Sequence, residues 1–325
     1  MATVYGLTGE LTSLVSERDQ NFRVTASDGD RSVFKIANEN ESAVTTDLQI
    51  KALLHLGEFQ CEVATPTVQL TLAGADISSI SDGDVSNMCR VVSYVAGIPL
   101  SANELSPKLA ARLGESAAAL DIALANFSHP GDRQSLLWDL QRASDLRPLL
   151  PYVDDATLHA EVSACLDDFD ARVQPALPSL RKQVIHADLN SDNVLVEAHR
   201  QDTIAGVIDF GDMTRAPLIM EVAIAASYLR ESDADVLLLI RPFVTAYHRV
   251  LPLLDEELAL LFDLIRARLA ASITILRWRA ATRGADDQYS SQNLLNERSA
   301  ETFLQRLDAL GRDAFLASIR DACRF

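Results

Sequence analysis

The chain changes from strand-like to helix-like patterning after the segment AGIPL, residues 96–100. Before it, NFRVTASDGDRSVFKIA consists of two short β-rich runs around a turn at Ser27–Asp30, which is typical of a β-hairpin. The runs TPTVQLTL and MCRVVSYV add two strand candidates, and one helix is predicted over residues 40–56. We therefore expect most strands of this chain to lie within its first hundred residues.

Long amphipathic helices are predicted for most of the remaining chain. The first, SPKLAARLGESAAALDIALANF, opens with Ser106 as a cap and Pro107 at the first helical position, and LWDLQRASDLRPLL and DATLHAEVSACLDDFDARV follow. Strand character returns only in QVIHADL, NVLVEA and DTIAGVIDF. The prediction is an α+β, bilobal fold. A small antiparallel β-rich N-lobe spans residues 1–96, a large mainly α-helical C-lobe spans residues 97–325, and a connector lies near Ser93–Leu100.

Size, charge and cysteine usage narrow the class of protein. A chain of 325 residues, 48% of them hydrophobic, can bury a sizeable core in two lobes. Its 46 acidic and 29 basic residues give a net charge of −17, which argues against nucleic acid as a partner and is compatible with a cationic small substrate. Four scattered cysteines without CxxC fit a reducing compartment. Without a signal peptide or a bilayer-spanning apolar stretch, we expect a cytoplasmic protein with no membrane partner, and its oligomeric state stays open.

Two polar loops follow short apolar runs in the second half of the chain. In VIHADLNSDNVLVE, His186, Asp188 and Asn193 form the pattern H-x-D-x-x-x-x-N. Further on, VIDFGD places Asp209 at the end of an apolar run that should pair as a strand with NVLVE. Two adjacent strands that end at one edge would bring Asp188, Asn193 and Asp209 together. Such oxygen ligands suit Mg²⁺, which takes few protein ligands and completes its shell with water and phosphate, as phosphoryl transfer to a hydroxyl requires.

These two motifs, in this order and at this spacing, resemble those of the protein-kinase-like fold. With Ala187 where protein kinases carry Arg, the chain is similar to the aminoglycoside phosphotransferase and choline kinase superfamily. The segments FKIAN, LWDL and DFGDM look closest to its hydroxylysine-kinase-like branch. The resemblance implies that Asp188 is the catalytic base, that Asn193 and Asp209 bind Mg²⁺, and that His186 is a structural partner beneath the metal loop. It also implies ATP or GTP as phosphate donor.

The same resemblance requires a lysine in the N-lobe, and RSVFKIA supplies Lys35. Strand alternation places Val33 on the same face, as expected if Val33 covers the nucleobase while the Lys35 ammonium reaches the phosphates. Most relatives pair this lysine with a Glu in the following helix. Here the inward stripe carries Gln49, whose amide can accept a hydrogen bond from Lys35 but brings no charge. Ser93 and Val95, at the connector, are the further nucleotide contacts that we expect.

The loop expected to cover the phosphates is Ser16–Phe22, SERDQNF, and it contains no glycine. Backbone amides can still face phosphate from such a turn, and Ser16 or Asn21 can add side-chain donors. Arg18 and Asp19 have no role that the sequence assigns, unless they form ion pairs locally.

The phosphate acceptor should approach Asp188 from the helical lobe. The stretch RARLAASITILRWRAATRGADDQY contains Arg266, Arg268, Trp278 and Tyr289, and arginines among aromatics suit a substrate with a carboxylate, such as an amino acid. The alternative is that the arginines face solvent and the tryptophan belongs to the core. A hydroxylysine-like acceptor is expected first. Homoserine, choline, ethanolamine and an aminoglycoside stay open, as does a catalytically inactive kinase fold that acts as a binding protein.

Overall fold

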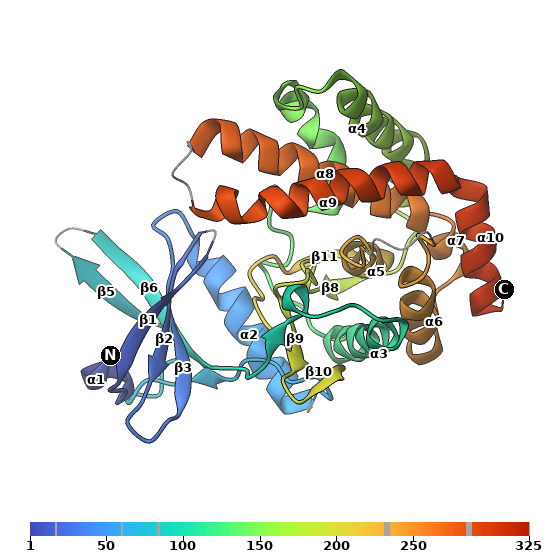
Figure 1. Cartoon of the computed structure of the whole chain (residues 1–325). Coiled ribbons are helices and arrows are strands. Elements are labelled where there is room, and N and C mark those ends of the chain that lie inside the picture. Colours follow the sequence, from blue (N-terminus) through green and yellow to red (C-terminus); the bar gives the residue numbers. More distant parts are fainter. Residues whose placement is uncertain (17, 60, 83–84, 231–234, 284–287, 325) are drawn as a thin grey trace.

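The structure is a computed structural model of the chain. It describes residues 1–324 apart from 17, 60, 83–84, 231–234 and 284–287, and it leaves the side chains at 82, 85 and 288–295 undescribed. Figure 1 shows a β-rich N-terminal part beside a larger, mainly helical C-terminal part, with the chain ends at opposite extremes of the molecule. The predicted α+β architecture is therefore confirmed.

The N-terminal sheet is antiparallel, with the strand order β1-β2-β3-β6-β4 and with β5 paired to β6. Its strands are β1 (Glu10–Leu14), β2 (Gln20–Thr25), β3 (Arg31–Ile36), β4 (Val68–Gln69), β5 (Ser78–Asp82) and β6 (Val85–Ser93). The predicted hairpin forms β2 and β3, and Gly29 takes a φ of 94° in its turn. Alternation along β3 also holds, because Phe34 packs in a small cluster with Tyr5 while Val33 packs against the main core.

The strand predicted for TPTVQLTL is largely wrong. Only Val68–Gln69 pairs with β6, and the chain then turns away. The backbone N–H of Thr71 donates to the Ala75 carbonyl at 2.7 Å, around Gly74 with a φ of 82°. This tight turn competes with continuation of the strand.

Helices make up most of the C-terminal part. The bounds are α1 (Ala2–Tyr5) and α2 (Ala43–Phe59) in the N-terminal part, and then α3 (Pro107–Leu124), α4 (Ala156–Asp168), α5 (Ile219–Ala226), α6 (Ile240–Val250), α7 (Asp255–Leu258), α8 (Leu261–Arg283), α9 (Gln288–Leu310) and α10 (Arg312–Cys323). The α3 cap is confirmed, because the Ser106 hydroxyl accepts a hydrogen bond from the Leu109 N–H at 3.1 Å. The helix predicted for LWDLQRASDLRPLL is instead 3₁₀ over Leu140–Tyr152, since Pro148 and Pro151 cannot donate α-helical hydrogen bonds.

Short strands hold the two polar loops inside the helical part. β7 (Ile98–Pro99), β9 (Val194–Glu197) and β10 (Arg200–Val207) form one antiparallel sheet, while β8 (Lys182–Ile185) pairs with β11 (Thr214–Pro217). The predicted pairing is confirmed, because Val207 lies opposite Val194. The ends of β8 and β10 and the start of β9 therefore carry the polar segments into one place.

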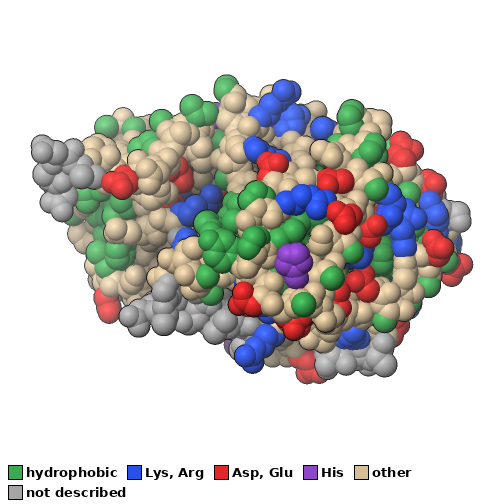
Figure 2. All heavy atoms as spheres, turned by 90° about the horizontal axis from the view of Figure 1, so that it is seen from above, with side chains coloured by type: hydrophobic (Ala, Val, Ile, Leu, Met, Phe, Trp, Pro, Cys, Tyr) green, Lys and Arg blue, Asp and Glu red, His purple; other side chains and the backbone are tan. Residues whose placement is uncertain are grey.

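Charge is mixed over the surface of the helical part. In the view of Figure 2, acidic and basic side chains are interspersed rather than gathered by sign. The helical part also has ion pairs between such side chains, for example Arg147 with Asp167 and Asp170 at 2.8 and 2.6 Å. Among the helices that the structure describes, none is long and apolar enough to cross a membrane.

Candidate active site

The loop between β8 and β9 is held from below by His186. This side chain is fully buried, lies edge-to-face against Phe210 with ring centroids 4.7 Å apart, and its Nε2 lies 3.1 Å from the Ile208 carbonyl. Its Nδ1 accepts a hydrogen bond from the Asp188 N–H at 3.3 Å. Burial lowers the pKa of His186 to about 4, so the ring is neutral and Nε2 carries the proton that it donates to Ile208. His186 thus joins the two polar loops.

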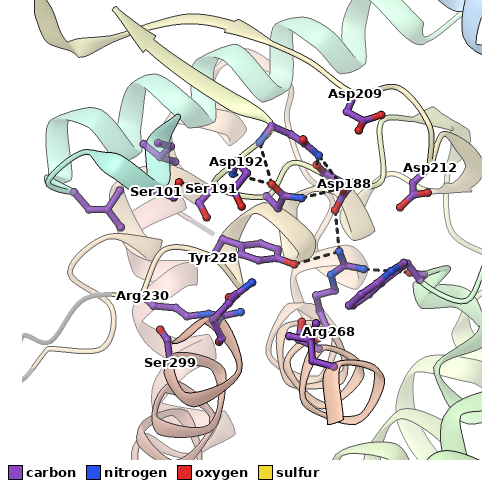
Figure 3. Close-up of a pocket in the computed structure, with 18 of the residues that line it drawn as sticks. Ser101, Asp188, Ser191, Asp192, Asp209, Asp212, Tyr228, Arg230, Arg268 and Ser299 are labelled. Atoms are coloured by element: carbon purple, nitrogen blue, oxygen red, sulfur yellow. Dashed lines mark hydrogen bonds and ion pairs between the residues drawn. The ribbon is translucent and has the colours of Figure 1, made fainter. Parts of the chain in front are cut away.

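Asp188 lies on the wall of a cavity and is fixed by three donors. Its Oδ2 accepts hydrogen bonds from Asn193 Nδ2 at 2.7 Å and from Asn190 Nδ2 at 2.9 Å. Its Oδ1 accepts from Arg268 Nη2 at 3.0 Å (Figure 3). Burial raises the pKa of Asp188, nearby Asp212 raises it further, and the Arg268 guanidinium opposes both. The carboxylate is therefore both oriented and a better proton acceptor than a solvent-exposed aspartate.

Both polar loops contain a residue in the left-handed backbone region. Ala187 has a φ of 62° and Asp209 a φ of 63°, an uncommon conformation for residues other than glycine. The Ala187 N–H donates to Glu221 Oε2 at 3.0 Å, and the Ile208 N–H donates to the Asn193 carbonyl at 2.9 Å. Such strained positions persist only where surrounding bonds hold them, and they are common at functional sites.

Lys35 from the N-terminal sheet reaches the second loop directly. Its Nζ lies 3.7 Å from Asp209 Oδ1. The charge of Lys35 lowers the pKa of Asp209, and the charge of Arg18 adds to the lowering. The structure therefore brings Lys35, Asp188, Asn193 and Asp209 to one place, as the sequence predicted.

Asn193 and Asp209 have the donor atoms that a hard divalent cation needs. The Nδ2 of Asn193 binds Asp188, while no described residue donates to its Oδ1. The Asp209 side chain is 49% exposed, and both residues line the cavity. Within the described residues, no three His, Cys, Asp or Glu side chains form a metal site by themselves. An ion here would take two protein ligands and complete its shell with phosphate and water, which is the usual arrangement for Mg²⁺.

The predicted contact between Gln49 and Lys35 is wrong. Gln49 Oε1 accepts a hydrogen bond from Arg90 Nη2 at 2.5 Å, and its Nε2 donates to Glu41 at 3.3 Å. Arg90 lies directly opposite Lys35 on the neighbouring strand β6, so both cations are on one face of the sheet. Arg90 is only 2% exposed, so leaving its guanidinium without an acceptor would cost more free energy than leaving Lys35 without Gln49. Lys35 pairs with Asp209 instead.

Two adjacent residues of the glycine-free loop, Arg18 and Asp19, form ion pairs with different parts of the protein. Arg18 pairs with Asp212, three residues after Asp209, so this contact is not the local one considered from the sequence. Asp19 does bind within the N-terminal part, where it accepts from the Asn38 N–H at 3.3 Å and lies 3.4 Å from Arg90 Nη2. Ser16 lines the cavity beside Asp188 and the smaller cavity that holds Lys35.

The other residues predicted to contact the nucleotide lie in or directly after strands of the N-terminal sheet. Asn21 lies opposite Lys35 on β2, and its buried Oδ1 has no hydrogen-bond partner. The Ser93 hydroxyl accepts from the Thr67 N–H at 2.9 Å. Val95 packs so closely on Gly206 that a Cβ there would lie 2.7 Å from Val95 Cγ1. No contact of these residues, or of Val33, tests the predicted nucleotide role, which stays a prediction.

Only one of the two arginines predicted for the acceptor lies at the cavity. Arg268 is 1% exposed, binds Asp188, and lies over the rings of Trp138 and Tyr228 with its Cζ 4.7 and 5.8 Å from their centroids. Arg266 is wrong as an acceptor contact, because it pairs with Asp168 and, at 2.6 Å, with Asp308. Residues two apart on a helix point to opposite sides, so α8 cannot present both arginines to one cavity.

The other two residues predicted to contact the acceptor are Trp278 and Tyr289. Trp278 is partly buried but does not line the cavity beside Asp188, and the Tyr289 side chain lies outside the described residues. Sequence reasoning missed Trp138, Tyr228 and Arg230, all of which line this cavity of about 790 Å³. The last two follow α5 in the segment SYLRE, where an aromatic and an arginine closely follow an apolar helix and were the available signal.

The fold and the joined loops define a class of protein. Two strand-edge loops that bring a carboxylate, a metal-type ligand pair and an N-terminal lysine together make this a small-molecule kinase with the protein-kinase-like fold. The chain belongs to the family described as "Phosphotransferase enzyme family", whose model matches residues 10–253. It is thus a kinase that phosphorylates an alcohol group, and the resemblance drawn from the two motifs is confirmed.

Individual relatives agree with this assignment. Hydroxylysine kinase from Danio rerio is 27% identical over 321 residues, covering 95% of this chain and 90% of that protein. Homoserine kinase from Methylobacillus flagellatus is 32% identical over 173 residues, which is 51% of this chain and 50% of that one. Among solved structures, a microcompartment-associated aminopropanol kinase has a TM-score of 0.70 at 20% identity and covers 96% of this chain and 94% of its own. Amicoumacin kinase hAmiN with AMP-PNP and Ca²⁺ has a TM-score of 0.69 at 18% identity, with 95% of each chain covered.

Proposed function

We propose that the protein transfers the γ-phosphate of ATP or GTP to the hydroxyl of a small hydroxylated amine, with a hydroxylysine-like amino acid as the preferred acceptor. The observation that carries this proposal is the position of Asp188, which three donors fix on the cavity wall beside Asp209. The relatives named hydroxylysine kinase align along nearly the whole chain, whereas those named homoserine kinase align along half of it. Homoserine and amino alcohols are therefore the second choice.

Each side chain of the site has a role in this proposal. Asp188 orients the acceptor hydroxyl and accepts its proton, and its raised pKa favours that transfer. Asn193 and Asp209 would hold Mg²⁺, which when bound neutralises charge on the phosphate oxygens. Lys35 binds the phosphates, and Arg268 keeps Asp188 oriented. Residues 1–96 and 97–325 act as the two lobes that enclose the nucleotide.

The direct test is ADP or GDP release in a coupled assay over hydroxylysine, homoserine, ethanolamine, choline and an aminoglycoside. We expect the highest kcat/KM with hydroxylysine. Asp188→Asn should lower kcat by about 10²- to 10⁴-fold, because it removes the proton acceptor. Its affinity for a non-hydrolysable ATP analogue, measured by calorimetry, should stay within a few-fold of wild type.

A matched control is Asp202→Asn, which removes a surface carboxylate that pairs with Lys108 on the same lobe. This variant should keep wild-type turnover, because the Asp202 side chain contacts Lys108 and Thr203 and neither polar loop. Full activity of Asp188→Asn would refute the mechanism. Release of neither ADP nor GDP with any of the five acceptors would refute the acceptor class.

A further inference from the structure

The cavity beside Asp188 carries unlike charges at its two ends. Asp188, Asp209 and Asp212 lie together at one end, where the phosphoryl transfer would occur. Figure 3 places Arg230 on the other side of the Tyr228 ring from these carboxylates. The acceptor therefore meets acidic groups with its hydroxyl end and a guanidinium with its far end.

Two arginines line the cavity, and one of them already has a carboxylate partner. Arg268 binds Asp188 Oδ1 at 3.0 Å and the Trp138 carbonyl at 3.2 Å, and it lies 3.4 Å from the Tyr228 hydroxyl. Its charge is thus balanced inside the protein by Asp188. A substrate carboxylate at Arg268 would also have to lie beside Asp188, which would repel it.

The charge of Arg230 has no carboxylate partner among the described residues. Its Nε donates to the Ser227 carbonyl at 2.6 Å, and its Nη1 donates to the backbone and side-chain oxygens of Asn296, both at 2.8 Å. All three acceptors are neutral. Its Nη2 is shielded from solvent and has no hydrogen-bond partner, and no carboxylate of the described residues pairs with this side chain.

The surroundings of Arg230 destabilise its positive charge. Burial lowers the pKa of Arg230 to about 10, and the nearby charge of Arg268 contributes to the lowering, whereas Tyr228 opposes it. Arg230 also lies over the Tyr228 ring, with its Cζ 5.0 Å from the centroid. A partly buried guanidinium with a like-charged neighbour and no carboxylate partner is stabilised by an anion.

We propose that Arg230 binds the carboxylate of the phosphate acceptor, and that this contact selects hydroxylated amino acids over the corresponding amino alcohols. The inference rests on the proposed function and adds the residue that decides the substrate class. A substrate carboxylate would give Arg230, which lines the cavity, the anionic partner that no described residue supplies, and the planar guanidinium can bind it in two-point geometry. Ser299 lies beside Arg230 in the cavity (Figure 3), and Glu104 and Asp192 also line the cavity and supply carboxylates that an ammonium group can bind.

The test uses acceptors that differ only by the carboxylate. Hydroxylysine and homoserine are each paired with the amino alcohol that remains when the carboxylate is removed. Wild-type protein should prefer each amino acid in kcat/KM. Arg230→Gln should lower kcat/KM for the amino acids by about 10- to 100-fold, the range of one charge-assisted contact, and change it less than about three-fold for the amino alcohols.

Two further variants separate recognition from folding. Arg230→Lys keeps the charge and loses the planar fork, so its kcat/KM for the amino acids should lie between wild type and Arg230→Gln. Arg277→Gln is the matched control, because Arg277 also bonds to α9, through Glu297 at 2.6 Å, but does not line the cavity. It should change kcat/KM for no acceptor. Binding of a non-hydrolysable ATP analogue should be equal in all variants.

The outcomes distinguish the two proposals. If Arg230→Gln lowers kcat/KM equally for amino acids and amino alcohols, or leaves both unchanged, Arg230 does not recognise the carboxylate. Wild-type protein that uses amino alcohols better than amino acids overturns the inference and leaves a kinase. Wild-type protein that uses none of the four acceptors refutes the proposed function together with the inference. If Arg230→Gln does not fold, the wild-type preference and Arg230→Lys decide the matter.

Discussion

Glu221 offers a quantitative test of the support beneath the catalytic loop. Its carboxylate is fully buried, and its Oε2 accepts the Ala187 N–H at 3.0 Å, one residue before Asp188. Its Oε1 has no hydrogen-bond partner. Burial raises the pKa of Glu221 from 4.5 to about 7, while the backbone hydrogen bonds and Arg268 oppose the shift. Ionised Glu221 therefore destabilises the folded protein relative to its protonated form.

The size of the effect follows from this pKa. A rise from 4.5 to about 7 corresponds to about 3 kcal/mol of unfolding free energy. Because the folded pKa is raised, this stability is present below pH 4.5 and is lost as pH rises through about 7. Between about pH 5 and about pH 8 the loss is about 2–3 kcal/mol. Glu221→Gln does not titrate, so relative to wild type it should gain about this amount over the same interval.

Urea unfolding of both proteins at the two pH values measures the difference. Subtraction removes the contribution of groups that titrate alike in both proteins. Burial raises the pKa of Asp121 and the charge of Glu221 raises it further, so removing that charge adds to the gain. Glu257→Gln is the contrast: this carboxylate is equally buried but accepts two bonds from Arg181, at 2.8 and 2.6 Å. Losing it should cost about 1–3 kcal/mol at both pH values, because Arg181 is partly exposed and water can solvate it. A difference between Glu221→Gln and wild type that is the same at both pH values would refute the reasoning.

The remaining predictions concern the N-terminal cations and their partners. Lys35→Ala should weaken binding of a non-hydrolysable ATP analogue about ten-fold or more in calorimetry, because a charge-assisted phosphate contact is lost. Gln49→Ala should leave the affinity for the ATP analogue nearly unchanged. In urea unfolding it should lower the unfolding free energy by about 1–3 kcal/mol, because Arg90 loses its buried acceptor. Weaker binding of the analogue without a loss of stability would instead indicate that Gln49 contacts Lys35. Arg18→Ala should raise the KM for nucleotide about 2- to 5-fold, because it removes a cation that phosphate can take over, whereas Asp212→Asn should not raise it. The double variant should be no worse than Arg18→Ala, and an equal rise in KM with Asp212→Asn would show that the pair acts as a unit instead.

Local signals in the sequence were enough for the catalytic and metal loops. His186, Asp188, Asn193 and Asp209 lie next to strands whose pairing is set by short apolar runs, so their proximity follows from chain connectivity. The cap at Ser106 was predictable for the same reason, since one hydroxyl and a following proline decide it.

Contacts between distant elements could not be read from the sequence. The alternation of β3 places Lys35 on a face, but only the register with β6 reveals that Arg90 shares that face and takes Gln49. Helical periodicity alone does not say which side of α8 faces the cavity, so Arg266 and Arg268 looked equivalent. Arg230 lies in an irregular segment after α5, where no periodicity predicts the direction of a side chain.

The ion pairs of Lys35 and Arg18 suggest how the charges of this site stay paired when the nucleotide binds. Lys35 pairs with Asp209, and Arg18 from the glycine-free loop pairs with Asp212, so two ion pairs join the N-terminal part to the loop after β10. Phosphate groups can take over both cations, and a divalent ion can take over Asp209, so that opposite charges stay paired when the nucleotide enters. A glycine-rich loop supplies backbone amides for this purpose, whereas SERDQNF supplies the charge of Arg18. The absence of glycine from this loop is therefore compatible with a phosphate site, because one guanidinium can replace several amide donors.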